Sequence, residues 1–234
     1  MSQIYADYHA RLEGFEVHDA ALGWIPEGAR VLDVGCATGY FARRLIEEKG
    51  CTVAGIEGDG EAAEKARAVC ERMHVGDLSD RRFLEGVQEQ AGVVFLGDVV
   101  EHVADPAPLL RHTRRWLAPG GFLLCSIPNV AYWKIRLELA RGRFDYQEIG
   151  ILDKTHLRFY TRPSFERLLI ECGFRNIAVA PVCSDAGALR LRTPRAPARP
   201  SRSRLRDFLL KRFPALMATQ YLFRADPAPA DAPR

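Results

Sequence analysis

The sequence of 234 residues has no apolar run of the roughly 18 to 20 residues that a membrane-spanning helix needs. Its six cysteines include no C-x-x-C pair, a spacing typical of zinc sites and dithiol redox centres. The first residues are largely polar or acidic and lack the apolar core of a signal peptide. We therefore expect a reduced, cytoplasmic protein without a transmembrane span.

Net positive charge is confined to one segment of the chain. Nine basic residues and one acidic residue give the stretch from Arg190 to Arg212 a charge of +8, against +3 for the whole chain. The remainder is therefore mildly acidic, at −5. Arginines interleaved with prolines can neutralise phosphates, which makes nucleic acid one partner to consider. Such a charged run is more often solvated surface.

Short apolar strand patterns alternate with helical patterns over most of the chain. This alternation predicts βαβ units and an α/β fold, in which a mostly parallel sheet is doubly wound with helices on both faces. The expected strands are 29–34, 51–56, 74–76, 92–96, 122–127, 176–182 and 218–224, and the expected helices are 4–22, 38–49, 59–72, 81–90, 105–116, 131–141, 161–173 and 205–213.

The first strand runs into a turn of small residues that contains Gly35 and Gly39. Glycines at such a turn let the backbone approach a ligand closely, and the next helix presents its free N–H groups there. The dinucleotide fingerprint G-x-G-x-x-G is not met, because Tyr40 occupies the position of its third glycine. A different nucleotide-type cofactor is indicated.

The stretch from Val31 to Gly39, VLDVGCATG, resembles motif I of class I S-adenosylmethionine (SAM) methyltransferases, with Ala37 in place of the middle glycine. The resemblance extends over roughly residues 31–174. It implies seven strands with an antiparallel final hairpin and an enzyme that uses SAM. It also implies cofactor-binding roles for Asp33, Gly35 and Gly39.

Further cofactor residues are implied at the following strand ends. Glu57 matches the family acid that binds both ribose hydroxyls, and a carboxylate can accept two O–H donors at once. Gly58 follows it. Asp77 matches the acid that accepts from the adenine amino group, with Leu78 beside the ring, and Gly97 is expected beside the methionine portion.

Asp98, Glu101 and His102 are spaced to share one face of a helical turn. They resemble the E-x-x-E-H element of small-RNA terminal 2′-O-methyltransferases, and ubiquinone-pathway O-methyltransferases share a similar E-H pair. His156 occupies the place of the further histidine that the small-RNA enzymes use. These four residues predict a Mg²⁺ or Mn²⁺ site that acidifies an acceptor hydroxyl. Two alternatives remain open: His156, with His102 and Asp98, as a metal-free base, or purely structural roles.

The stretch from Ser126 to His156 resembles bacterial O-methyltransferases of cell-surface polysaccharide and secondary-metabolite pathways. A hydroxyl of a sugar or another small polar molecule is therefore the leading acceptor. RNA ribose is the second candidate, and a SAM-binding scaffold or sensor is the non-enzyme alternative. We expect the following organisation: an N-terminal helical segment 1–28, a methyltransferase domain 29–183 with a substrate lid 131–159 after strand five, a basic insertion 184–216, a final strand 217–225 and a disordered tail 226–234.

Overall fold

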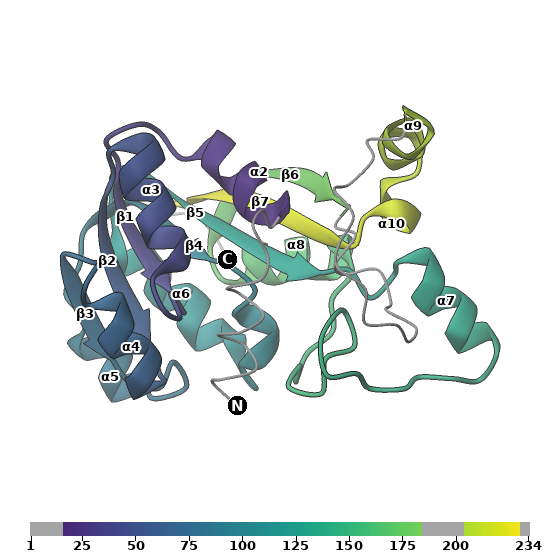
Figure 1. Cartoon of the computed structure of the whole chain (residues 1–234), viewed down its shortest axis with the longest axis horizontal. Helices are drawn as coiled ribbons and strands as arrows, with labels where there is room; N and C mark the ends of the chain where they lie inside the picture. Colours follow the sequence, from purple (N-terminus) through teal and green to yellow (C-terminus); the bar gives the residue numbers. More distant parts are fainter. Residues whose placement is uncertain (1–15, 184–203, 230–234) are drawn as a thin grey trace.

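The computed structural model describes residues 16–183 and 204–229 and forms three layers, a central sheet with helices on both faces (Figure 1). The first residues of the predicted N-terminal helix, most of the basic insertion and the end of the predicted tail lie outside the described residues. In the part of the chain that is described, no helix combines the length and apolarity needed to cross a membrane.

The sheet confirms the predicted architecture. Its strand order is β3-β2-β1-β4-β5-β7-β6, in which the first five strands are parallel and β7 pairs antiparallel with both β5 and β6. The chain order reverses between β1 and β4, and ligands of open α/β sheets bind at such a switch point. The strands are β1 (Arg30–Val34), β2 (Thr52–Glu57), β3 (Arg72–Val75), β4 (Ala91–Leu96), β5 (Leu117–Pro128), β6 (Phe174–Val182) and β7 (Gln220–Pro227).

Side chains alternate between the two faces of the sheet, and each face has its own apolar cluster. The helices are α2 (Glu16–Trp24), α3 (Tyr40–Lys49), α4 (Gly60–Ala66), α5 (Arg81–Gly86), α6 (Pro106–Trp116), α7 (Trp133–Ala140), α8 (Arg162–Glu171), α9 (Arg204–Arg212) and α10 (Pro214–Met217), with a short 3₁₀ turn η1 (Val100–His102). Leu32 and Val34 pack under α5, α6 and α8, whereas Val31 packs on the opposite face under α2, α3 and α4.

Local chemistry sets several boundaries. The Asp59 carboxylate caps the first turn of α4, and Thr161 and Ser164 form a reciprocal capping box at the start of α8. Helix α4 ends at Ala66, six residues earlier than predicted, because the Glu71 amide already bonds to Val53 as β3 joins the sheet. Strand β7 extends to Pro227, two residues into the predicted tail, and α10 was not anticipated.

The insertion after β5 consists of α7 and an irregular return segment that leads to α8 (Figure 1). The return segment is attached to the turn that follows β4. The amides of Leu157 and Arg158 both donate to the Glu101 carbonyl, at 2.8 and 3.1 Å, and the Arg158 side chain donates to the Ala104 carbonyl. The insertion therefore reaches back to the carboxyl ends of the parallel strands.

Candidate functional site

The turn between β1 and α3 has the backbone geometry that its glycines suggested. Gly35 and Gly39 lie at φ +72° and +78°, a region that favours glycine. Ala37 also adopts a positive φ of +48°, so this substituted position keeps the conformation that a glycine would hold. A Cβ on Gly35 would lie 2.6 Å from Val99, which shows that the turn and the chain after β4 are in direct contact.

Asp33 lies at the base of this turn and is almost completely buried. Its Oδ2 atom has no hydrogen-bond partner. Burial, followed by the nearby Glu57 charge, raises the pKa of Asp33 to about 7. A buried carboxylate oxygen without a partner in the protein is costly, and it suits a cationic or N–H group of a ligand.

Glu57 ends β2 and faces the same turn. One carboxylate oxygen accepts from the Ala37 amide at 2.8 Å, and the other accepts from the amides of Gly58 and Asp59. A carboxylate has about four lone-pair sites, so these three bonds leave room for about one further donor from a ligand hydroxyl. The structure therefore brings Asp33, Gly35, Glu57 and Gly58 together at the ends of two adjacent strands.

The other predicted cofactor residues also follow strand ends. The Asp77 carboxylate caps a turn by accepting from the Ser79 amide, and Leu78 packs partly buried against the core. Gly97 follows β4, where a Cβ would lie 2.7 Å from the Phe95 ring. Asp77, Leu78 and Gly97 thus follow the carboxyl ends of β3 and β4, at one edge of the sheet. The ligand contacts expected for them remain predictions.

The turn after β4 and the insertion bring Glu101, His102 and His156 together, with one ligand atom of each lying within 4.8 Å of the others. Glu101 is 1% exposed, and both of its carboxylate oxygens lack a hydrogen-bond partner. Burial, and then the nearby Asp98 charge, raises the pKa of Glu101 well above its ordinary value. A fully buried acid with two free oxygens beside two imidazoles fits a divalent metal ion.

Hydrogen bonds fix the orientation of both imidazoles. His156 Nδ1 lies 3.1 Å from the Ile151 carbonyl, which can only accept, so Nδ1 carries the proton. His102 Nδ1 lies 3.3 Å from the Thr155 carbonyl. In both rings Nε2 is then the atom available to a metal ion or a proton. Burial, followed by the neighbouring His102, lowers the pKa of His156, which keeps it neutral near pH 7.

Asp98 does not join this cluster. Ser126 donates to one of its carboxylate oxygens at 2.6 Å, and Gln220 donates to the other at 2.8 Å. Its backbone adopts φ +53°, which is unusual for a residue other than glycine. Sequence analysis missed both partners: Ser126 could have been noticed as a polar residue in an apolar strand, but Gln220 is 122 residues away.

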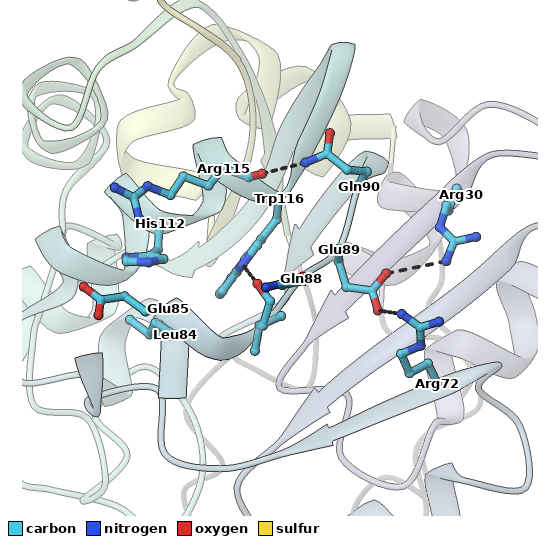
Figure 2. Close-up of a pocket in the computed structure, with 11 residues that line it drawn as sticks. Arg30, Arg72, Leu84, Glu85, Gln88, Glu89, Gln90, His112, Arg115 and Trp116 are labelled. Atoms are coloured by element: carbon cyan, nitrogen blue, oxygen red, sulfur yellow. Dashed lines mark hydrogen bonds and ion pairs between the residues drawn. The ribbon is translucent and has the colours of Figure 1, made fainter. Parts of the chain in front are cut away.

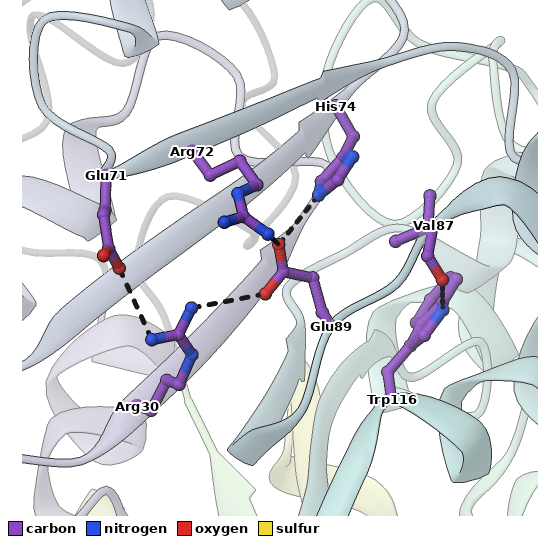
Figure 3. Close-up of polar contacts among 7 residues, drawn as sticks. All are labelled: Arg30, Glu71, Arg72, His74, Val87, Glu89 and Trp116. Carbon is purple, nitrogen blue, oxygen red and sulfur yellow. Dashed lines mark hydrogen bonds and ion pairs between the residues drawn. The ribbon is translucent and has the colours of Figure 1, made fainter.

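A pocket of about 490 Å³ lies at the opposite ends of the strands, where β1 and β3 begin (Figure 2). Its wall includes the buried acid Glu89. Glu89 is 5% exposed and accepts from Arg30, Arg72 and His74 (Figure 3). Arg30 also pairs with Glu71. This network joins β1, β3 and the start of β4, which indicates a structural role.

Comparisons with known proteins identify the family and the fold of the chain. The chain matches the family model of the methyltransferase domain over residues 6–179. It is 32% identical over 125 residues to a ubiquinone biosynthesis O-methyltransferase of Acinetobacter baylyi, and 32% identical over 124 residues to that of Paracidovorax citrulli. Each alignment covers 49% of this chain, which spans only about half, 52%, of either relative.

Solved structures share the whole fold. A SAM-dependent methyltransferase of Thermotoga maritima, described as a possible histamine N-methyltransferase, aligns with a TM-score of 0.62 at 17% identity, covering 96% of both chains. A SAM-dependent methyltransferase of Archaeoglobus fulgidus aligns with a TM-score of 0.63 at 19% identity, covering 94% of this chain and 98% of its own. The chain belongs to the methyltransferase domain family, and it has the fold of the SAM-dependent methyltransferases to which it aligns.

Proposed function

We propose that the protein transfers a methyl group from SAM to a hydroxyl of a small polar acceptor, a sugar or a secondary metabolite. The observation that carries this proposal is the cluster of Glu101, His102 and His156, whose first two members follow β4 just after Val99, the residue that packs on Gly35 of the cofactor turn. Its carboxylate is buried without a partner, and both imidazoles present Nε2. The O-methyltransferase names of the relatives support a hydroxyl acceptor.

The cofactor would be held by the residues at the ends of β1 to β4. In this proposal Asp33 and Gly35 face the methionine portion, together with Gly39 and Gly97. Glu57 accepts the ribose hydroxyls beside Gly58, and Asp77 and Leu78 contact the adenine. The buried Asp33 oxygen and the close packing of Gly35 on Val99 support this placement.

When bound, SAM supplies a methyl group activated by a sulfonium. The acceptor oxygen forms a bond to the methyl carbon as the carbon–sulfur bond breaks, and the hydroxyl proton has to leave. His156 can take that proton at Nε2, because its Nδ1–H is held by the Ile151 carbonyl and burial keeps the ring neutral. Alignment of the reacting atoms supplies much of the remaining rate enhancement.

A divalent ion held by Glu101, His102 and His156 would provide a second route, by lowering the pKa of a bound hydroxyl and orienting a vicinal diol. With Asp98 turned toward Ser126 and Gln220, the donor set is two imidazoles and one carboxylate. This set suits Mn²⁺ better than Mg²⁺, because imidazole favours the softer ion. Asp98 then positions the turn rather than binding the ion.

The test is methyl transfer by the purified protein from methyl-labelled SAM to sugars, aromatic diols and an RNA oligonucleotide with a free terminal ribose. The assay is run after chelator treatment and after addition of Mg²⁺ or Mn²⁺. We expect transfer to a small hydroxyl acceptor, with His156→Asn at least about a hundredfold slower. Full activity after chelation selects the metal-free base, and restoration by Mn²⁺ selects the metal.

Two results would contradict the proposal. Transfer to RNA alone, in a salt-dependent manner, would select the ribose hypothesis; most of the basic segment 190–212 on which it depends lies outside the described residues. The scaffold or sensor would be selected if the protein binds SAM but transfers no methyl group to any hydroxyl, and if His156→Asn leaves that SAM binding unchanged.

A further inference from the structure

Three aromatic rings of the insertion form one cluster. The ring centroids of Phe144 and Phe159 lie 5.5 Å apart, those of Phe144 and Tyr146 5.8 Å apart, and those of Tyr146 and Phe159 6.1 Å apart. Two of the pairs are edge-to-face, which is a favourable arrangement for aromatic rings. The cluster comes from two stretches of the insertion that are brought together by its fold.

One end of this cluster touches the candidate catalytic site. The Phe159 ring lies 6.2 Å from the His156 ring, which in turn lies 4.8 Å from the His102 ring. Phe159 is also anchored, because it packs against a small apolar core that includes Tyr132 and Leu152. A continuous row of rings therefore leads from the catalytic imidazoles into the insertion.

The other end of the cluster is exposed to solvent. Phe144 is 37% exposed and Tyr146 is 57% exposed, although large aromatic side chains are usually more deeply buried. Leaving aromatic area in water is unfavourable. An exposed apolar surface that borders a catalytic group is characteristic of a ligand-binding surface.

We propose that Phe144, Tyr146 and Phe159 form a platform that binds the apolar face of a cyclic acceptor and delivers its hydroxyl to His156. The inference rests on the proposed function and narrows its acceptor class. The acceptor carries a ring with a flat apolar face, either an aromatic ring or the C–H face of a pyranose, next to the hydroxyl that is methylated. An open-chain diol offers the same hydroxyls without that face.

The test compares three diols of similar size: catechol, methyl α-glucopyranoside and butane-2,3-diol. For the wild type we expect at least one cyclic diol to have a kcat/KM about tenfold or more above that of butane-2,3-diol. The double variant Phe144→Leu/Tyr146→Leu keeps apolar side chains but removes two rings. Its KM for the cyclic diol should rise about tenfold, with kcat changed less than about threefold.

Further variants separate ring binding from general effects. Tyr146→Phe keeps the ring that Tyr146→Leu removes, so its KM should rise less than that of Tyr146→Leu. Phe208→Leu removes an aromatic side chain that is 61% exposed on α9, outside the insertion, and should change neither KM nor kcat. Comparison of catechol with the glucoside identifies the kind of ring that the platform binds. The cyclic diol preferred by the wild type should lose more affinity in the double variant than the other one.

Binding is also measured without turnover, by titrating the preferred cyclic diol into protein saturated with S-adenosylhomocysteine. A weaker affinity of the double variant there supports the platform even if no methyl transfer occurs, which would contradict only the proposed function. The platform is overturned if the double variant binds the cyclic diols as the wild type does. Equal kcat/KM values for cyclic and open-chain diols would also overturn it.

Discussion

Glu89 and Glu101 flank the same strand, β4, and both are almost completely buried, at 5% and 1% exposed. Glu89, before the strand, is surrounded by Arg30, Arg72 and His74 (Figure 3). Glu101, after the strand, has no hydrogen-bond partner on either carboxylate oxygen. The same residue type is thus stabilising at one end of the sheet and costly at the other.

The pKa values follow this difference. Burial opposes ionisation of Glu89, but the hydrogen bond from His74 and the Arg72 charge outweigh it, and its pKa is lowered. Burial and Asp98 raise the pKa of Glu101 instead. A folded protein retains an unpaired buried acid where a ligand or a reaction uses it. The comparison therefore predicts opposite consequences when each acid is replaced by its amide.

The largest effect is expected for Glu101→Gln. This replacement keeps the shape but removes the charge, so methyl transfer should fall by about 10²- to 10³-fold. The free energy of unfolding should stay unchanged or rise, because no ion pair is lost. Glu148→Gln is the control: it removes a carboxylate of the insertion whose ion pair with Lys154 is exposed. Activity and urea unfolding are measured for both.

Asp33→Asn should have an intermediate effect on cofactor binding. The affinity for SAM, measured by calorimetry, should fall about ten- to a hundredfold, as expected for one charge-assisted hydrogen bond.

The free energy of unfolding of the cofactor-free protein should instead be higher for Asp33→Asn than for the wild type. The pKa of Asp33 rises from 3.8 to about 7 on folding, so the wild type loses stability as the pH increases through that interval. At pH 8 the variant should be more stable by about 2 to 4 kcal/mol. If the free energy of unfolding of the wild type were the same at pH 5 and pH 8, the raised pKa of Asp33 would be contradicted.

The smallest effect on activity is expected for Glu89→Gln, which should leave methyl transfer unchanged. It removes the shared partner of Arg30 and Arg72, and because both arginines are partly exposed the cost should be about 1 to 3 kcal/mol at pH 7. A lowered folded pKa adds stability above the unfolded value, so the difference between variant and wild type should vanish as the pH falls through the Glu89 pKa. Urea unfolding from pH 7 down to about pH 2 checks this.

The sequence allowed the sheet and the strand-end residues to be predicted because both depend on local patterns. Alternating strands and helices determine a doubly wound sheet, and parallel strands bring Asp33, Glu57 and Asp98 to one edge whatever the packing details. The grouping of His102 with His156 came from a resemblance and not from spacing. The boundaries of α4 and β7 were less predictable, since pairing with neighbouring strands decides where they end.

The direction of individual side chains was not predictable in the same way. Asp98 has the spacing of a metal ligand, yet its positive φ and its bonds to Ser126 and Gln220 turn it toward β5 and β7. The Glu89 network depends on Arg30 from β1 and on Arg72 and His74 from β3. Contacts of this kind join positions far apart in the chain, and a single sequence carries no signal for them.

The most direct test of the division between the two ends of the sheet is a crossed comparison of Glu101→Gln and Glu89→Gln. For each variant, the methyl-transfer rate per folded molecule and the free energy of unfolding at pH 7 are measured. We predict that Glu101→Gln loses transfer and keeps stability, whereas Glu89→Gln loses stability and keeps transfer. A Glu101→Gln protein that is destabilised but transfers methyl groups at the wild-type rate would contradict the account.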